Sequence, residues 1–128
     1  MKSLFKIVLM LIIIGGAVFL YQNQSKTQEL YVLSWDNYIG KDTIANFEKH
    51  CSCKVVYELM KSNEEGLAKL KSSPGVYDVA VFSDYMVKIL KDADGLEALD
   101  ASKIPNLKNI SEDFHGSYFD PKLEYSVP

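Results

Sequence analysis

Apolar residues form three short runs along the chain, and a helical pattern follows each of them. The runs lie at residues 30–34, 54–60 and 76–82, and their β-branched and aromatic residues predict β-strands. The third run is the most continuous, which is typical of a strand buried on both faces of a sheet. A repeated strand–helix order favours right-handed crossovers between parallel strands. The pattern therefore predicts an α/β domain with a mostly parallel sheet.

Each predicted helix begins with residues that suit a helix N-terminus. The first starts near Asp42, whose charge suits the positive end of the helix dipole. The second starts with a capping box, in which Ser62 caps the first turn and Glu65 reaches back. The third is predicted over residues 84–91. We expect the apolar faces of the first and third helices to consist of Ile44, Phe47 and Cys51, and of Met86, Ile89 and Leu90.

An uninterrupted apolar run lies near the N-terminus, at residues 7–21, after Lys2 and Lys6. A positive stretch followed by a short apolar run is typical of a secretory signal. At about 1.5 Å per residue, the run is shorter than the roughly 30 Å hydrocarbon layer of a membrane. We therefore expect residues 1–28 to be a signal peptide, or an N-terminal membrane anchor, with a polar spacer. The globular domain then begins at residue 29.

The composition excludes several classes of protein. The chain has 128 residues, of which 48% are hydrophobic and 24% charged, as in a globular domain and unlike a disordered chain. Its net charge of −3 argues against a nucleic-acid interface, which needs a basic face. There is no Gly-rich phosphate loop, and no Ser–His arrangement of the kind that hydrolases use. We therefore predict no cofactor and no enzymatic activity.

Ligands gather at the carboxyl ends of parallel strands, so the residues after each strand, at 34–39, 60–65 and 82–85, are the positions to inspect. The candidate site consists of six of them, which follow the first and third strands: Trp35, Asp36, Tyr38, Ser83, Asp84 and Tyr85. An ammonium group over an aromatic ring gains about 0.5–2 kcal/mol, and carboxylates add charge-assisted hydrogen bonds. These residues suit an organic cation. In the alternative interpretation, Asp84 only caps its helix and the rings pack at the edge of the core.

These strand ends lie in a sequence that resembles a known family. The stretches LYVLSWDNYIGKDTIANFEKH, KVVYELMKSNEEGLAKL and YDVAVFSDYMVKIL, with the tail segments LDASKIPNLKNI and LEYSVP, occur in this order. Together they are similar to the N-terminal lobe of the periplasmic spermidine/putrescine-binding proteins. The most specific features are W-x-x-Y after the first strand, S-N-E at the second helix and S-x-Y after the third strand. The resemblance covers nearly all of residues 29–128.

The resemblance implies the first lobe of a type II periplasmic-binding-protein fold, with helices flanking a mostly parallel sheet. It implies a periplasmic protein that binds a polyamine and delivers it to the membrane permease of an ABC importer. It also places five residues in the ligand cleft: Trp35, Asp36, Tyr38, Ser83 and Tyr85. In such a cleft, rings cover the methylene chain and carboxylates hold the ammonium ends.

The chain also departs from the family pattern. Asn37 stands where the putrescine-type members have an acid, and Phe82 replaces the usual proline. Residues 50–53 replace a turn that contains glycine, which removes the easy left-handed cap of the first helix. Family members are much longer, so we expect residues 29–128 to be a lobe truncated before the second lobe. The alternative is a membrane-tethered single-lobe interaction domain, or a remnant with no transport role, and a retained segment 7–21 would favour it.

The two cysteines raise a separate question. The two cysteines, Cys51 and Cys53, and the neighbouring His50 would together offer zinc or copper two thiolates and one imidazole, but a fourth ligand is missing. A disulfide between residues two apart is expected to be strained. We therefore predict two free, surface or partly buried thiols, and no metal.

Overall fold

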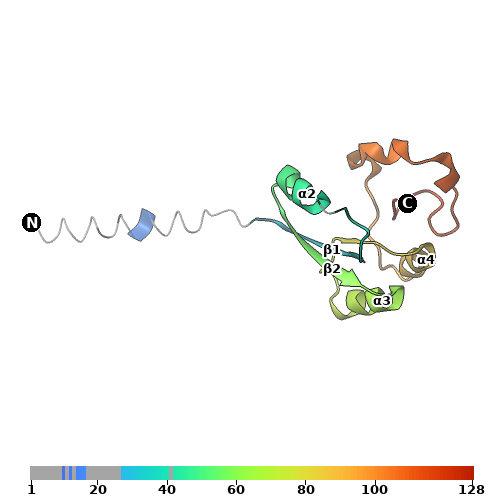
Figure 1. The fold of residues 1–128 in the computed structure, drawn as a ribbon, viewed down its shortest axis with the longest axis horizontal. Helices are drawn as coiled ribbons and strands as arrows, with labels where there is room; N and C mark the ends of the chain where they lie inside the picture. Colours follow the sequence, from blue (N-terminus) through green and yellow to red (C-terminus); the bar gives the residue numbers. More distant parts are fainter. Residues whose placement is uncertain (1–9, 11, 13, 17–26, 41) are drawn as a thin grey trace, which may run out of the picture.

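The computed structural model of the chain describes residues 10, 12, 14–16, 27–40 and 42–128. The signal or anchor predicted within residues 1–28 lies largely outside them. In the described part of the chain, no helix is long and apolar enough to span a bilayer. From residue 29 onward, strands and helices alternate as the sequence pattern predicts (Figure 1).

The elements of the described residues lie close to their predicted bounds. They are β1 (Glu29–Trp35), α2 (Thr43–Cys51), β2 (Lys54–Met60), α3 (Asn63–Ser72), β3 (Val79–Ala80) and α4 (Asp84–Asp92). Short 3-10 helices follow at Ala101–Lys103, Pro105–Asn109 and Glu112–Phe114. The predicted capping box is confirmed, because the Ser62 hydroxyl accepts a hydrogen bond from the Glu65 amide at 3.0 Å. The Glu65 carboxylate in turn accepts one from the Lys61 amide at 3.0 Å.

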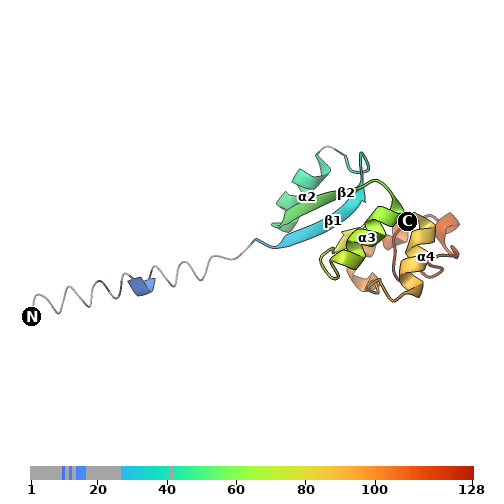
Figure 2. The same ribbon diagram turned by 90° about the horizontal axis from the view of Figure 1, so that it is seen from below.

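The three strands form one parallel sheet in the order β2-β1-β3, which confirms the predicted parallel α/β architecture. The central strand β1 pairs with β2 from Glu29↔Lys54 to Trp35↔Met60 without a change of register. Helices α2 and α3 lie on opposite sides of the β1–β2 pair (Figures 1 and 2). All three strands therefore end at the same edge of the sheet, which we call the carboxyl edge.

The third strand differs from its prediction. Instead of a buried strand over residues 76–82, only Val79–Ala80 is paired, and both residues are exposed. Backbone hydrogen bonds from Asp78 to Tyr31 (3.0 Å) and from Val81 to Leu33 (2.9 Å) hold the segment to β1. The run is apolar enough for a buried strand, but β3 is an edge strand of the described sheet and has a neighbour on one side alone.

The core lies where α3 and α4 meet the sheet. Its buried apolar residues are Val32, Leu33, Met60, Met86, Leu90 and Leu123. Gly66 lets α3 lie close to the ends of the strands, because a Cβ atom there would meet Met60 Sδ and would lie 2.6 Å from Phe82 Cε1. Two predicted core positions are wrong: Phe47 of α2 and Ile89 of α4 are 44% and 48% exposed. Helix α4 packs through Met86 and Leu90 and leaves Ile89 at the margin of this contact, whereas α2 has no buried residue.

The chain after α4 is held by a buried carboxylate. Asp120 is 1% exposed and accepts hydrogen bonds from the Glu124, Tyr125 and Ser126 amides and from the Ser126 hydroxyl, at 2.8–3.1 Å. Burial raises the pKa of Asp120, but these hydrogen bonds outweigh it and the net pKa is lowered. A further hydrogen bond from the Leu99 amide to the Glu124 carbonyl (2.7 Å) ties the C-terminal segment to the stretch that follows α4.

Candidate functional site

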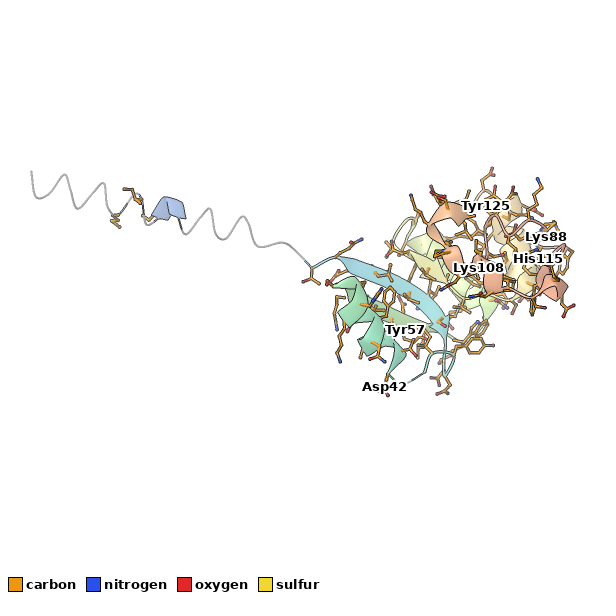
Figure 3. The ribbon with its side chains drawn as sticks, turned by 90° about the horizontal axis from the view of Figure 1, so that it is seen from above. Asp42, Tyr57, Lys88, Lys108, His115 and Tyr125 are labelled. Carbon is orange, nitrogen blue, oxygen red and sulfur yellow. A yellow bond between two sulfur atoms is a disulfide. The ribbon has the colours of Figure 1, made fainter. Side chains whose placement is uncertain are left out.

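Two aromatic rings lie at the carboxyl end of β1. Trp35 is the last residue of this strand, and its carbonyl accepts a hydrogen bond from the Tyr57 hydroxyl at 3.1 Å. The following turn, with Asn37 at φ 61°, brings the Tyr38 ring to 6.2 Å from the Trp35 ring, centroid to centroid, at an interplanar angle of 39°. Tyr38 is 69% exposed. The pair therefore offers ring faces at an open surface. Figure 3 shows Tyr57 in the strand region beside α2, whereas His115 and Tyr125 lie in the C-terminal part of the chain.

A hydrogen-bonded cluster joins the loops after β2 and β3. Its centre is Asn63, the first residue of α3, which is 7% exposed. The Asn63 amide nitrogen donates to the Ser83 hydroxyl (3.1 Å) and to the Tyr85 hydroxyl (2.8 Å). The Asn63 side-chain oxygen accepts from the Ser83 backbone amide (3.1 Å). Because β1 lies between β2 and β3, this cluster bridges the carboxyl end of β1, where Trp35 is.

Glu64 extends the cluster toward solvent. Its carboxylate accepts a hydrogen bond from the Tyr85 hydroxyl at 3.0 Å. A hydrogen bond from its own backbone amide, followed by the one from Tyr85, lowers the pKa of Glu64. The side chain is therefore an exposed carboxylate at neutral pH, beside the phenol group of Tyr85.

Asp84 is the first residue of α4, and Ser83 holds the N-cap position without a side-chain cap hydrogen bond. The interpretation of Asp84 as the cap is therefore wrong, and its role in ligand binding stays a prediction. The Asp84 carboxylate accepts a hydrogen bond from the Tyr85 amide at 2.7 Å, in the first turn of α4. Asp84 also interacts with the C-terminal part of the chain, because a hydrogen bond between Asp84 and Tyr118 raises the pKa of Tyr118. Asp84 is exposed, so one carboxylate stabilises the helix start and remains open to solvent.

The structure thus places the six predicted residues along one edge, in two groups. Ser83 and Tyr85 are joined through Asn63, and Trp35 is joined to Tyr38. Asp36 and Asp84 are exposed beside them. Two hollows among the described residues lie elsewhere. One, of about 720 Å³, lies between β3 and the C-terminal segment, and neither is lined by any of the six. The candidate site is an open surface.

Two members of this surface, Asn63 and Glu64, are absent from the six residues that the sequence singles out. Both lie within residues 60–65, which the sequence marks for inspection, but the capping box at this helix start gives Glu64 no separate role. Their position directly after the end of β2, on the carboxyl edge, is the signal that identifies them.

The cysteine prediction is wrong. Cys51 and Cys53 form a disulfide, with their Cα atoms 5.2 Å apart, which is within the ordinary range. Ser52 makes this distance possible, because it ends α2 in the left-handed region (φ 55°, ψ 34°). The sequence predicts no such left-handed cap here, because the glycine of the family pattern is absent. Among the described residues, no group of three or more His, Cys, Asp or Glu side chains is arranged to hold a metal ion.

Comparison with known proteins gives a consistent set of relatives, although no family model matches. The chain is 32% identical over 123 residues to the putrescine/cadaverine-binding protein of Pseudomonas aeruginosa, covering 96% of this chain and 34% of that protein. It is 35% identical over 100 residues to the spermidine/putrescine-binding periplasmic protein of Escherichia coli, covering 77% of this chain and 29% of that protein.

A solved structure agrees with these matches. The spermidine/putrescine ABC transporter substrate-binding protein of Streptococcus pneumoniae aligns with a TM-score of 0.76 and 36% identity. The alignment covers 80% of this chain and 32% of that one. The fold is therefore that of a periplasmic binding protein, and the chain spans about a third of the length of the relatives it matches.

Proposed function

Because this chain belongs to the family of the spermidine/putrescine-binding periplasmic proteins, of whose length it spans about a third, we propose that its carboxyl edge binds a polyamine. In this proposal the chain acts in the periplasm as part of the solute-binding component of an ABC importer, with the membrane permease as its partner. Its role is binding and not catalysis. The observation that carries the proposal is the Asn63 cluster, which bridges the end of β1 beside the Trp35–Tyr38 pair.

The chemistry of this edge suits a chain of methylene groups between ammonium ends. The faces of Trp35 and Tyr38 cover apolar CH₂ groups and attract the adjacent positive charge. Glu64 and Asp84 accept hydrogen bonds from an ammonium group on the other side, and the lowered pKa of Glu64 keeps it charged. Asn63 holds the Ser83 and Tyr85 hydroxyls in place, so the polar side of the surface is ordered before a ligand arrives.

An open surface limits the affinity. Binding sites for small molecules ordinarily enclose most of the ligand, and this edge covers one side of it. The Trp35 and Tyr38 rings together contribute about 1–2 kcal/mol, and a charge-assisted hydrogen bond adds about 1.5–3 kcal/mol. A total of about 4 kcal/mol corresponds to a dissociation constant of about 1 mM. We therefore expect these residues to bind weakly, with affinities for different amines that rank according to the charge and length of the amine.

Fluorescence of Trp35 tests the proposal directly, because it is the single tryptophan of the chain and lies at the site. Titration with spermidine and putrescine is expected to change its emission in a saturable way. Hexanediol and magnesium chloride at matched ionic strength serve as controls for the methylene chain and for the charge. The proposal fails if the amines give no saturable change up to about ten times the expected 1 mM, or if the controls give the same one.

Paired variants separate a specific site from general charge attraction. Asp84→Asn removes a carboxylate beside Tyr85, and Asp113→Asn removes one from an exposed 3-10 helix in the C-terminal part of the chain. Each variant lowers the negative charge by one. Weaker amine binding in the Asp84 variant alone supports a site at the carboxyl edge. Equal weakening in both variants would mean that the amines bind the acidic surface at large.

A further inference from the structure

The Cys51–Cys53 disulfide lies at the opposite edge of the sheet from the proposed amine site. Cys51 is the last residue of α2, and Cys53 directly precedes the first residue of β2. The strand β2 has 7 residues, which at about 3.3 Å per residue puts about 20 Å between the disulfide and the carboxyl edge. Nothing in amine binding at the carboxyl edge accounts for this pair.

The disulfide contributes little to holding the fold together. The stabilisation from a disulfide grows with the length of the loop that it closes, and this loop contains a single intervening residue. The same junction is held independently by Glu48 of α2. Its carboxylate accepts a hydrogen bond from the Val55 amide (2.9 Å) and pairs with the Lys54 ammonium group (2.9 Å). The junction between α2 and β2 therefore has a clamp that survives reduction.

The pair is also partly accessible to a reaction partner. Both cysteines are half-buried, the intervening Ser52 is exposed, and α2 has no buried residue. Ser52 lies at φ 55°, in the left-handed region that residues with a Cβ atom disfavour. Exposed disulfides in disfavoured local conformations are the ones that exchange with thiols, whereas structural disulfides resist reduction.

We propose that Cys51 and Cys53 form a thiol–disulfide exchange site whose substrates are dithiols. A thiolate of the dithiol attacks Cys53 Sγ, the bond between the two cysteine sulfurs breaks, and its electron pair passes to Cys51 Sγ. The Cys53 amide already donates a hydrogen bond to Cys51 Sγ at 3.2 Å, which stabilises the negative charge on this leaving sulfur. Cys51 Sγ then takes up a proton, and the new thiol is within reach of the Glu48 carbonyl oxygen (3.7 Å).

The second thiol of the partner completes the exchange. This second thiol, as a thiolate, attacks the partner's sulfur atom in the mixed disulfide and so closes the partner's own disulfide. Cys53 is released as a thiolate, which takes up a proton. The chain gains two electrons and two protons, and the dithiol leaves as a disulfide. The reverse sequence oxidises the chain, so the site passes electrons in either direction according to its partner.

The experiment follows the cysteines and the fold together in the full chain. Protein purified without reductant is treated with dithiothreitol, a small dithiol, or with thioredoxin, a protein dithiol, and free thiols are alkylated and counted by mass spectrometry. We expect two alkylated cysteines after reduction while the far-UV circular dichroism and the Trp35 emission stay unchanged. In a series of glutathione redox buffers, we expect both the oxidised and the reduced form to be populated. Reduction by thioredoxin as well as by dithiothreitol identifies a protein partner, and reduction by dithiothreitol alone identifies a small one.

Three results would overturn the proposal. The first is that the thiols are already free before any reductant is added. The second is that the cysteines are alkylated only as the circular dichroism signal of the folded chain is lost. The third is that the chain stays fully oxidised across the glutathione series, as a structural disulfide does. The Cys51→Ser variant is the matched test of the mechanism. Its Cys53 is expected to retain glutathione as a stable mixed disulfide, because the sulfur that would resolve it is absent. None of these readouts involves an amine, so they stand or fall separately from the proposed function.

Discussion

The Asn63 cluster makes the sharpest prediction about the candidate site. Asn63→Ala removes three hydrogen bonds at once: to the Ser83 hydroxyl, to the Tyr85 hydroxyl and from the Ser83 amide. A hydrogen bond contributes about 1 kcal/mol on average, and a buried polar group left without a partner costs about 1–3 kcal/mol. Because Asn63 is buried, we expect the free energy of unfolding to fall by about 3 kcal/mol.

Urea unfolding followed by Trp35 emission measures this loss, since the one tryptophan lies next to the cluster. Asn106→Ala is the matched control, because Asn106 is exposed in a 3-10 helix and its loss is expected to change stability by less than about 0.5 kcal/mol. A loss of less than about 0.5 kcal/mol in the Asn63 variant would refute the reasoning, since the three bonds would then contribute nothing.

A double-mutant cycle isolates the bond that matters most for the surface. Tyr85→Phe removes the hydroxyl that accepts from Asn63 and donates to Glu64, while it keeps the ring. Combined with Asn63→Ala, it is expected to show a coupling free energy of about 1 kcal/mol. Additive losses would mean that Asn63 and Tyr85 stabilise the chain separately, and that the cluster is not one unit.

Three further predictions concern the frame around the site. Gly66→Ala is expected to lower stability by about 1–3 kcal/mol in urea unfolding, because its Cβ would overlap Met60 and would lie 2.6 Å from Phe82; an unchanged midpoint would show that α3 shifts freely. Ser52→Gly is expected to raise the melting temperature, because glycine removes a left-handed penalty of about 1 kcal/mol; an unchanged or lower value contradicts this. Asp120→Asn is expected to destabilise the chain by roughly 2 kcal/mol at pH 7. The lowered pKa of Asp120 means that the stability from its carboxylate is present above the unfolded value near pH 4 and is lost as the pH falls through the folded value. The difference in the free energy of unfolding between the native chain and the Asp120→Asn variant should therefore be smaller at pH 3 than at pH 7. A difference that stays constant with pH would mean that the loss comes from packing and not from the charge of the carboxylate.

Local signals in the sequence predict most of the fold. The alternation of residues 54–60 predicts β2 with its observed bounds, and the capping box predicts the start of α3, because both depend on neighbours within a few positions. The predicted burial of residues 76–82, Phe47 and Ile89 is wrong for a common reason. An apolar face shows that a residue can be buried, and whether it is buried depends on which element lies against it.

Two features of the candidate sites depend on distant geometry. Asn63 and Ser83 are 20 positions apart and follow strands that are not adjacent, so their contact arises from the strand order β2-β1-β3. The disulfide depends on Ser52, whose left-handed backbone a sequence rule assigns to glycine. In the fold, α2 and β2 fix both ends of this turn, and the Glu48 clamp holds them together.

The parallel sheet also determines how the two proposed sites relate to each other. In a parallel sheet every strand runs from one edge to the other, so residues that precede strands and residues that follow them lie at opposite edges. The disulfide precedes β2, and the Asn63 cluster follows it. Reduction of the disulfide reaches the cluster only if β2 shifts along β1. The unbroken register from Glu29↔Lys54 to Trp35↔Met60 opposes such a shift, because a slip of one residue would turn Met60, the one buried residue of β2, to the other face of the sheet. Amine binding should therefore be the same in the oxidised and reduced chain, and a difference between them would mean that the strand pair transmits a change that its register argues against.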